Sequence, residues 1–243
     1  MSNKNFNKNF GFSKFSQNDF YNKVNKELIN SLDIKSNQKI VDLGCGSGGI
    51  TNLILEKLFT SKSNNFSIIA VDHSETILKE AKNNLKTISE SILSFVQSRY
   101  EEFSSKLKEK VDLVVLCNAI HYLDDKELVI KDVMKILKPN GKFAFNSSFF
   151  DGAHPKDTFG FYRKWMFKAI KILAKDYKLR PVKSEKIESR VQLNPVQYKN
   201  VLENCGMKIV SNKIRTVQVP IEGWLDISSF KDFIEGVMPG VKL

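Results

Sequence analysis

Closely spaced glycines beside a carboxylate are the residues of this 243-residue chain best suited to chemistry. Gly44, Gly46 and Gly48 stand at every second position, and Asp42 precedes the first of them by two residues. Glycine has no Cβ and adopts positive φ at little cost, so such a turn lets backbone approach a ligand closely. The pattern predicts a site for a nucleotide-type ligand.

A second carboxylate, Asp72, ends the apolar run over residues 66–72. An acidic residue at the end of the second strand of a nucleotide-binding unit accepts hydrogen bonds from ribose hydroxyls. A dinucleotide fold would show Gly-x-Gly-x-x-Gly, whereas this chain has Gly-x-Gly-x-Gly. The glycines alone are weak evidence, but glycines between a strand and a helix, followed by such an acid, are much stronger.

Alternating strands and helices are expected to position these residues. Strands are predicted over residues 39–42, 66–72, 92–97, 111–116 and 142–147, with helices over 19–32, 50–58, 74–85 and 126–137. This order favours a Rossmann-like α/β fold: a mostly parallel sheet with helices on both faces. Right-handed crossovers place the carboxyl ends of parallel strands at one edge, where ligands of such folds bind.

The alternation stops after the fifth predicted strand. We therefore divide the chain into a lid segment and helix (1–34), a cofactor-binding core (35–147), a helical cap inserted after the fifth strand (148–193) and a C-terminal part of the core (194–243). The cap is expected to hold a long helix over 159–179. The last part is expected to hold a helix from Pro195, a sixth strand over 207–220 and a helix within 224–237. No seventh strand is recognisable, so either residues 207–220 fold back on themselves or the chain is part of a longer protein.

The composition is that of a globular protein, with 42% hydrophobic residues and a formal net charge of +11. No apolar run reaches the roughly 20 residues of a transmembrane helix, and the first 15 residues lack the apolar core of a secretory signal. The three cysteines show neither disulfide nor zinc-site spacing, so we expect a cytoplasmic protein without a metal site.

Four motifs resemble those of class I S-adenosylmethionine-dependent methyltransferases. They are Val41-Asp42-Leu43-Gly44-Cys45-Gly46-Ser47-Gly48, Ala70-Val71-Asp72-His73-Ser74 with Ile77-Leu78, Asp112-Leu113-Val114-Val115 leading into Cys117-Asn118-Ala119-Ile120-His121-Tyr122-Leu123, and Leu137-Lys138-Pro139-Asn140-Gly141-Lys142. The resemblance spans about residues 35–150. It is similar to the branch that acts on small molecules, such as quinone and natural-product methyltransferases.

The resemblance implies a role for each matching position. The glycine turn would hold the methionine part of S-adenosylmethionine, Asp42 its amino group and Asp72 the ribose hydroxyls, while Ile77 would pack on adenine. Asn118 would lie beneath the methionine part and the sulfonium. The complete predicted cofactor-binding set is Asp42, Gly44, Cys45, Gly46, Gly48, Asp72, His73, Ile77, Arg99, Tyr100 and Asn118.

The chain departs from the family at one position. After the third strand the family commonly has an aspartate near the adenine amino group, and here Ser98-Arg99-Tyr100 occupies that place. Arginine has no acceptor for an amino hydrogen. Adenine recognition would then depend on backbone atoms or on Gln97.

Two histidines are candidate catalytic residues. His121 follows the fourth strand and could accept a proton from a hydroxyl or amine, or could simply line the pocket wall. His154, after the fifth strand, could face the same pocket or only form a turn before the cap. Four N-terminal phenylalanines could close over the pocket as a lid or pack on the cap: Phe6, Phe10, Phe12 and Phe15.

The predicted cap helix carries a basic stripe, which we call the lysine stripe: Lys164, Lys168, Lys171, Lys175 and Lys178. Steps of four and three residues place all five on one helix face. The stripe could be an ordinary solvated face. It could also contact an acidic protein such as an acyl carrier, an anionic membrane surface or nucleic acid.

Three functions remain open from the sequence. The first is methyl transfer to an oxygen, nitrogen or activated carbon of a small molecule, which an acidic partner could carry. The alternative is an RNA or nucleic-acid methyltransferase that uses the basic cap face. Against the alternative, the residues after the fourth strand lack the Asn/Asp-Pro-Pro-aromatic segment usual in amino-group base methylases. A non-catalytic cofactor-binding protein would need a damaged glycine turn or a lost ribose acid, and neither is present.

Overall fold

The computed structural model describes residues 13–180, 192–230 and 233–234. The chain forms two compact units, which we treat separately. The sheet unit consists of Lys23–Ala153 and Glu188–Ile214. The helical unit consists of Met1–Asn22, His154–Ile187 and Arg215–Leu243.

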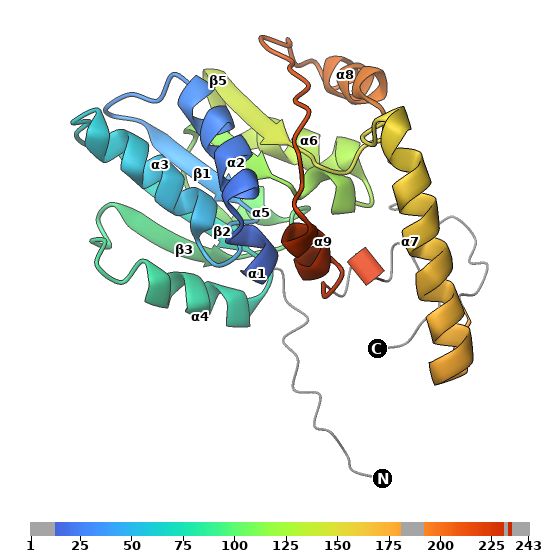
Figure 1. Ribbon diagram of the computed structural model, residues 1–243. Coiled ribbons are helices and arrows are strands. Elements are labelled where there is room, and N and C mark those ends of the chain that lie inside the picture. Colours follow the sequence, from blue (N-terminus) through green and yellow to red (C-terminus); the bar gives the residue numbers. More distant parts are fainter. Residues whose placement is uncertain (1–12, 181–191, 231–232, 235–243) are drawn as a thin grey trace. The chain divides into compact units, whose positions relative to one another are not determined.

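A five-stranded, all-parallel sheet in the order β3-β2-β1-β4-β5 is the centre of the sheet unit (Figure 1). Its strands are β1(Lys39–Leu43), β2(Ser67–Asp72), β3(Leu93–Gln97), β4(Val111–Cys117) and β5(Leu137–Asn146). All five strands were expected, and the parallel sheet with helices on both faces confirms the predicted fold class.

The helices of the sheet unit connect these strands. They are α2(Asp19–Ser31), whose first turn belongs to the helical unit, then α3(Gly49–Thr60), α4(Glu75–Asn84), α5(Phe103–Lys106), the 3₁₀ turn η1(Ile120–Tyr122), α6(Lys126–Ile136) and α8(Pro195–Asn204). Side-chain caps begin several of them. The Ser74 side chain accepts a hydrogen bond from Ile77 N, and Asn194 and Gln197 form a capping box before α8.

Alternate strand residues supply two hydrophobic cores, one on each face of the sheet. Ile40, Ile68 and Val115 belong to the face that α2, α3 and α4 cover. Val41, Val71 and Val114 belong to the face that α5, α6 and α8 cover. Because the central strands β1, β2 and β4 are buried on both faces, they are nearly continuous runs of apolar residues.

The strand register brings the predicted site residues to one edge. Asp42 of β1 pairs with Ala70 of β2 on one side and with Val115 of β4 on the other. The glycine turn, Asp72 and Asn118 therefore all follow strands that end at the same carboxyl edge. This is the edge at which open parallel sheets bind ligands.

One long helix, several short helical segments and an aromatic cluster make up the described part of the helical unit. Its elements are α1(Ser13–Ser16), η2(Lys156–Thr158), α7(Phe159–Ile172), the π-helical turn η3(Leu173–Tyr177) and α9(Ile221–Ile227). The Trp165 and Trp224 ring centroids are 6.2 Å apart, and those of Tyr162 and Trp165 are 5.9 Å apart. The long cap helix predicted over 159–179 thus corresponds to α7 and η3.

The prediction of a sixth strand over residues 207–220 was wrong. The segment is described, but it forms neither strand nor helix and is largely exposed. Val210 is 85% exposed and Ile214 62% exposed, so its alternating apolar side chains have no sheet face on which to pack. The alternation of apolar and polar residues is typical of a strand, but a strand also needs a neighbouring strand with which to pair.

Among the helices of the described residues, none has the length and apolar character needed to span a membrane.

Candidate functional site

The glycine turn between β1 and α3 has positive φ at all three predicted glycine positions. Gly44, Gly46 and Gly48 have φ values of 75°, 53° and 94°, in the left-handed region that side chains disfavour. Gly44 and Cys45 donate their backbone N–H groups to Val71 O at 2.7 and 2.9 Å, which ties the turn to β2. A Cβ at Gly44 would lie 2.7 Å from Tyr100 Oη, so this position has no room for a side chain.

Asp72, at the end of β2, is held by the turn and by the start of α4. Its Oδ2 accepts from Gly46 N at 3.1 Å, and its Oδ1 accepts from Ser74 N at 2.9 Å. His73 Nδ1 lies 3.3 Å from the same Oδ1. The carboxylate is buried and fixed in orientation, and each oxygen keeps a lone pair beyond its backbone partner.

Asp42 is fully buried, and only one of its two carboxylate oxygens has a hydrogen-bond partner. Its Oδ2 accepts from Thr51 Oγ1 at 2.6 Å, whereas its Oδ1 has no hydrogen-bond partner. Burial raises the pKa of Asp42 to about 7, the Thr51 hydrogen bond acts in the opposite direction, and the Asp72 charge raises the pKa further. A buried carboxylate oxygen without a partner is suited to a ligand that brings a hydrogen-bond donor or a positive charge.

The remaining predicted adenine-side residues lie around β3 and α4. Tyr100 is close to Gly44, and burial raises the pKa of its hydroxyl. Arg99, in contrast, is exposed and its Nε lies 3.5 Å from Glu101 Oε2. Gln97 donates from Nε2 to His73 O at 3.1 Å, and Ile77 is 36% exposed. Arg99 is therefore not directed into the glycine turn, whereas Tyr100 is.

Asn118, after β4, is the centre of a buried amide network. It has a φ of 50°, a conformation that asparagine tolerates better than most residues. Its Oδ1 accepts from Ser148 N at 3.0 Å and Ser148 Oγ at 2.8 Å, while its Nδ2 donates to Asn25 Oδ1 at 3.2 Å. Asn146, at the end of β5, also donates from Nδ2 to Asn25 Oδ1, at 2.9 Å.

The sequence reasoning missed Asn25 and Thr51. Asn25 is 0% exposed, although it lies on a helix that was considered only for its apolar spacing. A signal was present: Tyr21, Asn25 and Ile29 stand four residues apart on one face of α2, so Asn25 interrupts a buried stripe. Thr51 gave no comparable signal, because threonine in the first turn of a helix is common.

His121 is buried at 2% exposure, in η1 just after β4. Its Nδ1 lies 2.9 Å from Ser147 Oγ, and Ser147 Oγ in turn donates to Phe149 O at 2.8 Å. Because the serine proton is already used, Ser147 accepts from His121, which places the ring proton on Nδ1. His121 Nε2 then carries a lone pair, is buried and has no partner.

Burial and the nearby Lys126 charge lower the pKa of His121 to about 3. The imidazole is therefore neutral at physiological pH and can only accept a hydrogen bond through Nε2. The ring centroids of Tyr122 and Phe149 lie 4.1 and 4.9 Å from that of His121. Aromatic rings therefore pack against His121, with Ser147 as its hydrogen-bond partner.

His154, the second candidate, belongs to the helical unit. Its ring centroid lies 5.1 Å from that of Tyr162 and 6.3 Å from that of Trp224. These contacts make His154 part of the aromatic cluster of that unit, and its predicted place in a catalytic pocket stays a prediction. The predicted lid residues Phe6, Phe10 and Phe12 lie outside the described residues. Phe15 is buried against Phe20 and Tyr21 within the helical unit.

The lysine stripe lies on α7, η3 and the residue after it, and all five of its lysines are exposed. None of the five makes a salt bridge to a described residue. From Arg163 to Arg180 the chain has seven positive residues and one acid, Asp176. Phe167 and Tyr177 in the same stretch are 73% and 64% exposed. The outer surface of this helix is therefore strongly basic and partly aromatic.

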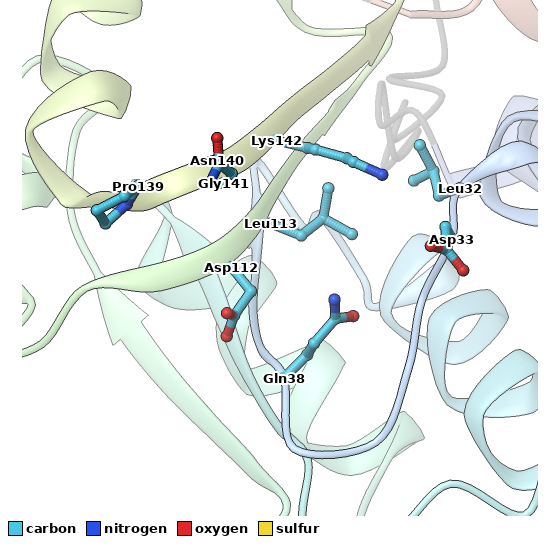
Figure 2. A pocket seen from close by; sticks show the side chains of 9 residues that line it. All are labelled: Leu32, Asp33, Gln38, Asp112, Leu113, Pro139, Asn140, Gly141 and Lys142. Atoms are coloured by element: carbon cyan, nitrogen blue, oxygen red, sulfur yellow. The ribbon is translucent and has the colours of Figure 1, made fainter.

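A pocket of about 90 Å³ lies at the opposite edge of the sheet (Figure 2). Its lining includes Gln38, just before β1, and Asp112, near the start of β4, so it lies at the amino ends of these strands. Lys138 Nζ lies 2.8 Å from Asp112 Oδ2, and Lys39 N donates to the same atom at 2.8 Å. The local carboxylate is already neutralised, so we place the functional site at the carboxyl edge instead.

Residues 34–204 match a family described as "Methyltransferase domain". A malonyl-[acyl-carrier protein] O-methyltransferase from Acetivibrio thermocellus is 29% identical over 143 residues, which are 56% of this chain and 47% of that protein. A phosphoethanolamine N-methyltransferase from Triticum aestivum is 24% identical over 79% of this chain and 33% of its own length. The chain thus spans half or less of the length of these curated relatives.

Solved structures show the same fold. A methyltransferase in complex with the Haloferax volcanii Trm112 activator superposes with a TM-score of 0.55 at 18% identity, over 81% of this chain and 72% of that one. Haemonchus contortus phosphoethanolamine N-methyltransferase 2, in complex with S-adenosylmethionine, gives 0.52 at 15% identity, over 80% and 40%. Since the family match covers well over half of the sequence and agrees with the fold and the motifs, the chain belongs to the methyltransferase-domain family.

Proposed function

We propose that this chain transfers a methyl group from S-adenosylmethionine to a small-molecule acceptor. The observation that carries the proposal is the paired carboxylate arrangement at the glycine turn. Asp42 offers a buried Oδ1 without a partner, and Asp72 is fixed by Gly46 N and Ser74 N. Family membership and the cofactor-bound relatives of the same fold support S-adenosylmethionine as the cofactor, as the motifs predicted.

The residues present suit this cofactor. Gly46, where a Cβ would meet nothing within 4 Å, leaves room beside the backbone, Asp42 Oδ1 would take the amino group, and Asp72 would take the ribose hydroxyls. Ile77, partly exposed on the first turn of α4, would pack on the adenine ring. When bound, the sulfonium supplies an activated methyl group, so the hard chemistry belongs to the cofactor. The protein then has to align the acceptor, a contribution that can reach roughly 7–11 kcal/mol.

We assign His121 the role of holding the acceptor nucleophile. With its proton on Nδ1 toward Ser147, it presents an Nε2 lone pair, which suits a hydroxyl or amine that still carries its proton. The low pKa of His121 keeps Nε2 available as an acceptor at neutral pH. The same lone pair would repel an ionised carboxylate. Acceptors with an O–H or N–H at the reacting atom are therefore favoured.

The lysine stripe supports an acidic partner that carries the acceptor. Five exposed lysines on α7, on η3 and directly after it, with exposed aromatic side chains in the same stretch, are complementary to the acidic surface of an acyl carrier protein. Two curated relatives are named malonyl-[acyl-carrier protein] O-methyltransferase; they support the carrier but not the reacting group, because malonyl offers a carboxylate. A nucleic acid could also bind the positive charge of the lysine stripe. Methyl transfer to different acceptors distinguishes a carrier protein from a nucleic acid.

The test is methyl transfer from radiolabelled S-adenosylmethionine to three acceptor pools: acyl carrier proteins loaded with hydroxy- or amino-acyl groups, a small-molecule extract, and total RNA. We expect label in one of the first two pools. Label confined to RNA would contradict the proposal and establish the nucleic-acid alternative. Absence of label from all three, in a protein shown to bind the cofactor, would contradict methyl transfer to this class of acceptor.

Charge reversal of the stripe then tests the carrier. In the variant Lys168→Glu, Lys171→Glu, Lys175→Glu, we expect the KM for a loaded carrier to rise about tenfold, with kcat and transfer to free acceptors unchanged. The control is Lys62→Glu, Lys86→Glu, Lys108→Glu, which changes net charge equally on exposed lysines of the sheet unit. Equal effects of the two variants on KM would mean that the stripe is an ordinary solvated face.

A further inference from the structure

Asn25 of α2 is a buried amide whose donor is unused. Its side chain is 0% exposed, and its Oδ1 accepts from both Asn118 Nδ2 and Asn146 Nδ2. Its Nδ2 is also buried and has no hydrogen-bond partner. Buried polar groups in native proteins are nearly always paired, so an unpaired amide donor needs an explanation.

The orientation of this amide follows from its neighbours. If Asn25 were flipped, its NH₂ group would face the NH₂ groups of Asn118 and Asn146, and two hydrogen bonds would become repulsive contacts. The Asn118 amide is fixed in turn, because its Oδ1 accepts from Ser148 N and Ser148 Oγ. The network therefore directs Asn25 Nδ2 away from these amides, with both hydrogens available.

The network lies at the edge that holds the glycine turn. Asp42 and Val115 are register partners on β1 and β4. Cys45 of the turn and Asn118 of the network each follow these partners by three residues. The chain segments that carry the turn and the network thus leave adjacent strands at the same edge.

The charge of the cofactor supplies a candidate acceptor for this donor. Its amino-acid end has an ammonium group, which Asp42 would take, and a carboxylate, which needs donors. Within the part of the chain that the structure describes, Lys126 is the one buried cation, and its Nζ already donates to Leu123 O. Asn25 Nδ2, in contrast, is a buried donor that has no hydrogen-bond partner.

We propose that Asn25 is a cofactor-binding residue whose Nδ2 donates to the carboxylate at the amino-acid end of S-adenosylmethionine. This inference rests on the proposed function, because it needs the cofactor at the glycine turn. It assigns α2, which lies outside the four sequence motifs, a direct part in the site. It also gives the amide network a purpose, since the network holds the Asn25 amide in the donating orientation.

The test compares two ligands and two variants by calorimetry on the full chain. Asn25→Asp retains an oxygen for both asparagine donors but replaces the Nδ2 donor with a second oxygen. We expect Asn25→Asp to weaken S-adenosylmethionine binding at least about tenfold. Decarboxylated S-adenosylmethionine lacks the carboxylate, so its affinity should stay within about twofold or improve. Asn25→Ala, which removes the donor without adding charge, should give the same ligand preference if the aspartate variant does not fold.

The possible outcomes distinguish a failure of this inference from a failure of the proposed function. Equal weakening of both ligands would show that Asn25 only supports the fold, and no change with either ligand would show that it makes no contact. Either result overturns the inference while leaving the proposed function standing. A wild-type protein that binds neither ligand would instead overturn the proposed function. Thermal melts of each variant record any loss of stability separately from ligand preference.

Discussion

Replacing Asp72 with alanine should weaken the binding of S-adenosylhomocysteine at least about 100-fold. Hydrogen bonds to an ionised group contribute about 1.5–3 kcal/mol each, and the variant loses those to two ribose hydroxyls. Asp72→Ala also removes the acceptors of Gly46 N and Ser74 N, so the glycine turn loses part of its support. Isothermal titration calorimetry measures the affinity, and a thermal melt confirms that the variant is folded.

Asp112→Ala is the matched control for this experiment. Asp112 is also a strand aspartate with a backbone donor, Lys39 N, but it lies at the opposite edge of the sheet and lines the pocket of Figure 2. We expect its affinity for S-adenosylhomocysteine to equal that of the wild type. If Asp112→Ala abolished binding and Asp72→Ala did not, the ligand would occupy that pocket and the site assignment would be wrong.

Cofactor affinity should depend on pH through Asp42. In the free protein, burial raises the pKa of Asp42 to about 7, so the carboxyl is largely protonated at pH 5. A bound ammonium group needs the ionised form, so below pH 7 binding must release a proton. The Kd should therefore rise by up to about tenfold for each pH unit below 7, or about 100-fold at pH 5. Calorimetry in buffers with different ionisation enthalpies measures both the affinity and the released proton.

The same pKa fixes the sign of the effect on stability. The unfolded chain loses the Asp42 proton near 3.8, whereas the folded protein loses it near 7. Between these values the folded state binds more protons, so this group's contribution to stability falls as pH rises from about 4 to 7.

The variant Asp42→Asn tests the pH dependence of cofactor affinity. Because its side chain cannot titrate, its affinity for the cofactor should not change over pH 5–7. A wild-type profile that is equally flat would remove Asp42 from the amino-group site.

The strands, the helices on both faces and the glycine turn followed from local signals. Apolar runs such as residues 66–72 predicted buried strands, and Ser74 and Asn194 predicted helix starts that the structure confirms. The family motifs occupied the expected positions because a turn with φ of 75° at Gly44 tolerates few residues other than glycine. Sequence therefore predicted the glycine turn between β1 and α3 and the position of Asp72 at the end of β2.

Long-range contacts account for what sequence did not reveal. Asn25 accepts hydrogen bonds from Asn118, 93 residues later in the sequence, and from Asn146, 121 residues later. No local sequence pattern encodes such contacts. The segment 207–220 alternates like a strand, yet strand formation depends on a neighbour that sequence periodicity does not specify. His121 was recognised as a candidate, but its tautomer depends on Ser147, 26 residues away.

Competition binding tests the central claim, that the glycine turn holds S-adenosylmethionine. Radiolabelled S-adenosylmethionine is bound to the full wild-type chain and challenged with S-adenosylhomocysteine, NAD or ATP. We predict saturable binding that S-adenosylhomocysteine displaces and that excess NAD and ATP do not. Absence of saturable binding would contradict this claim. Displacement by NAD with no effect of S-adenosylhomocysteine would also contradict it and would indicate that the glycine turn binds a dinucleotide.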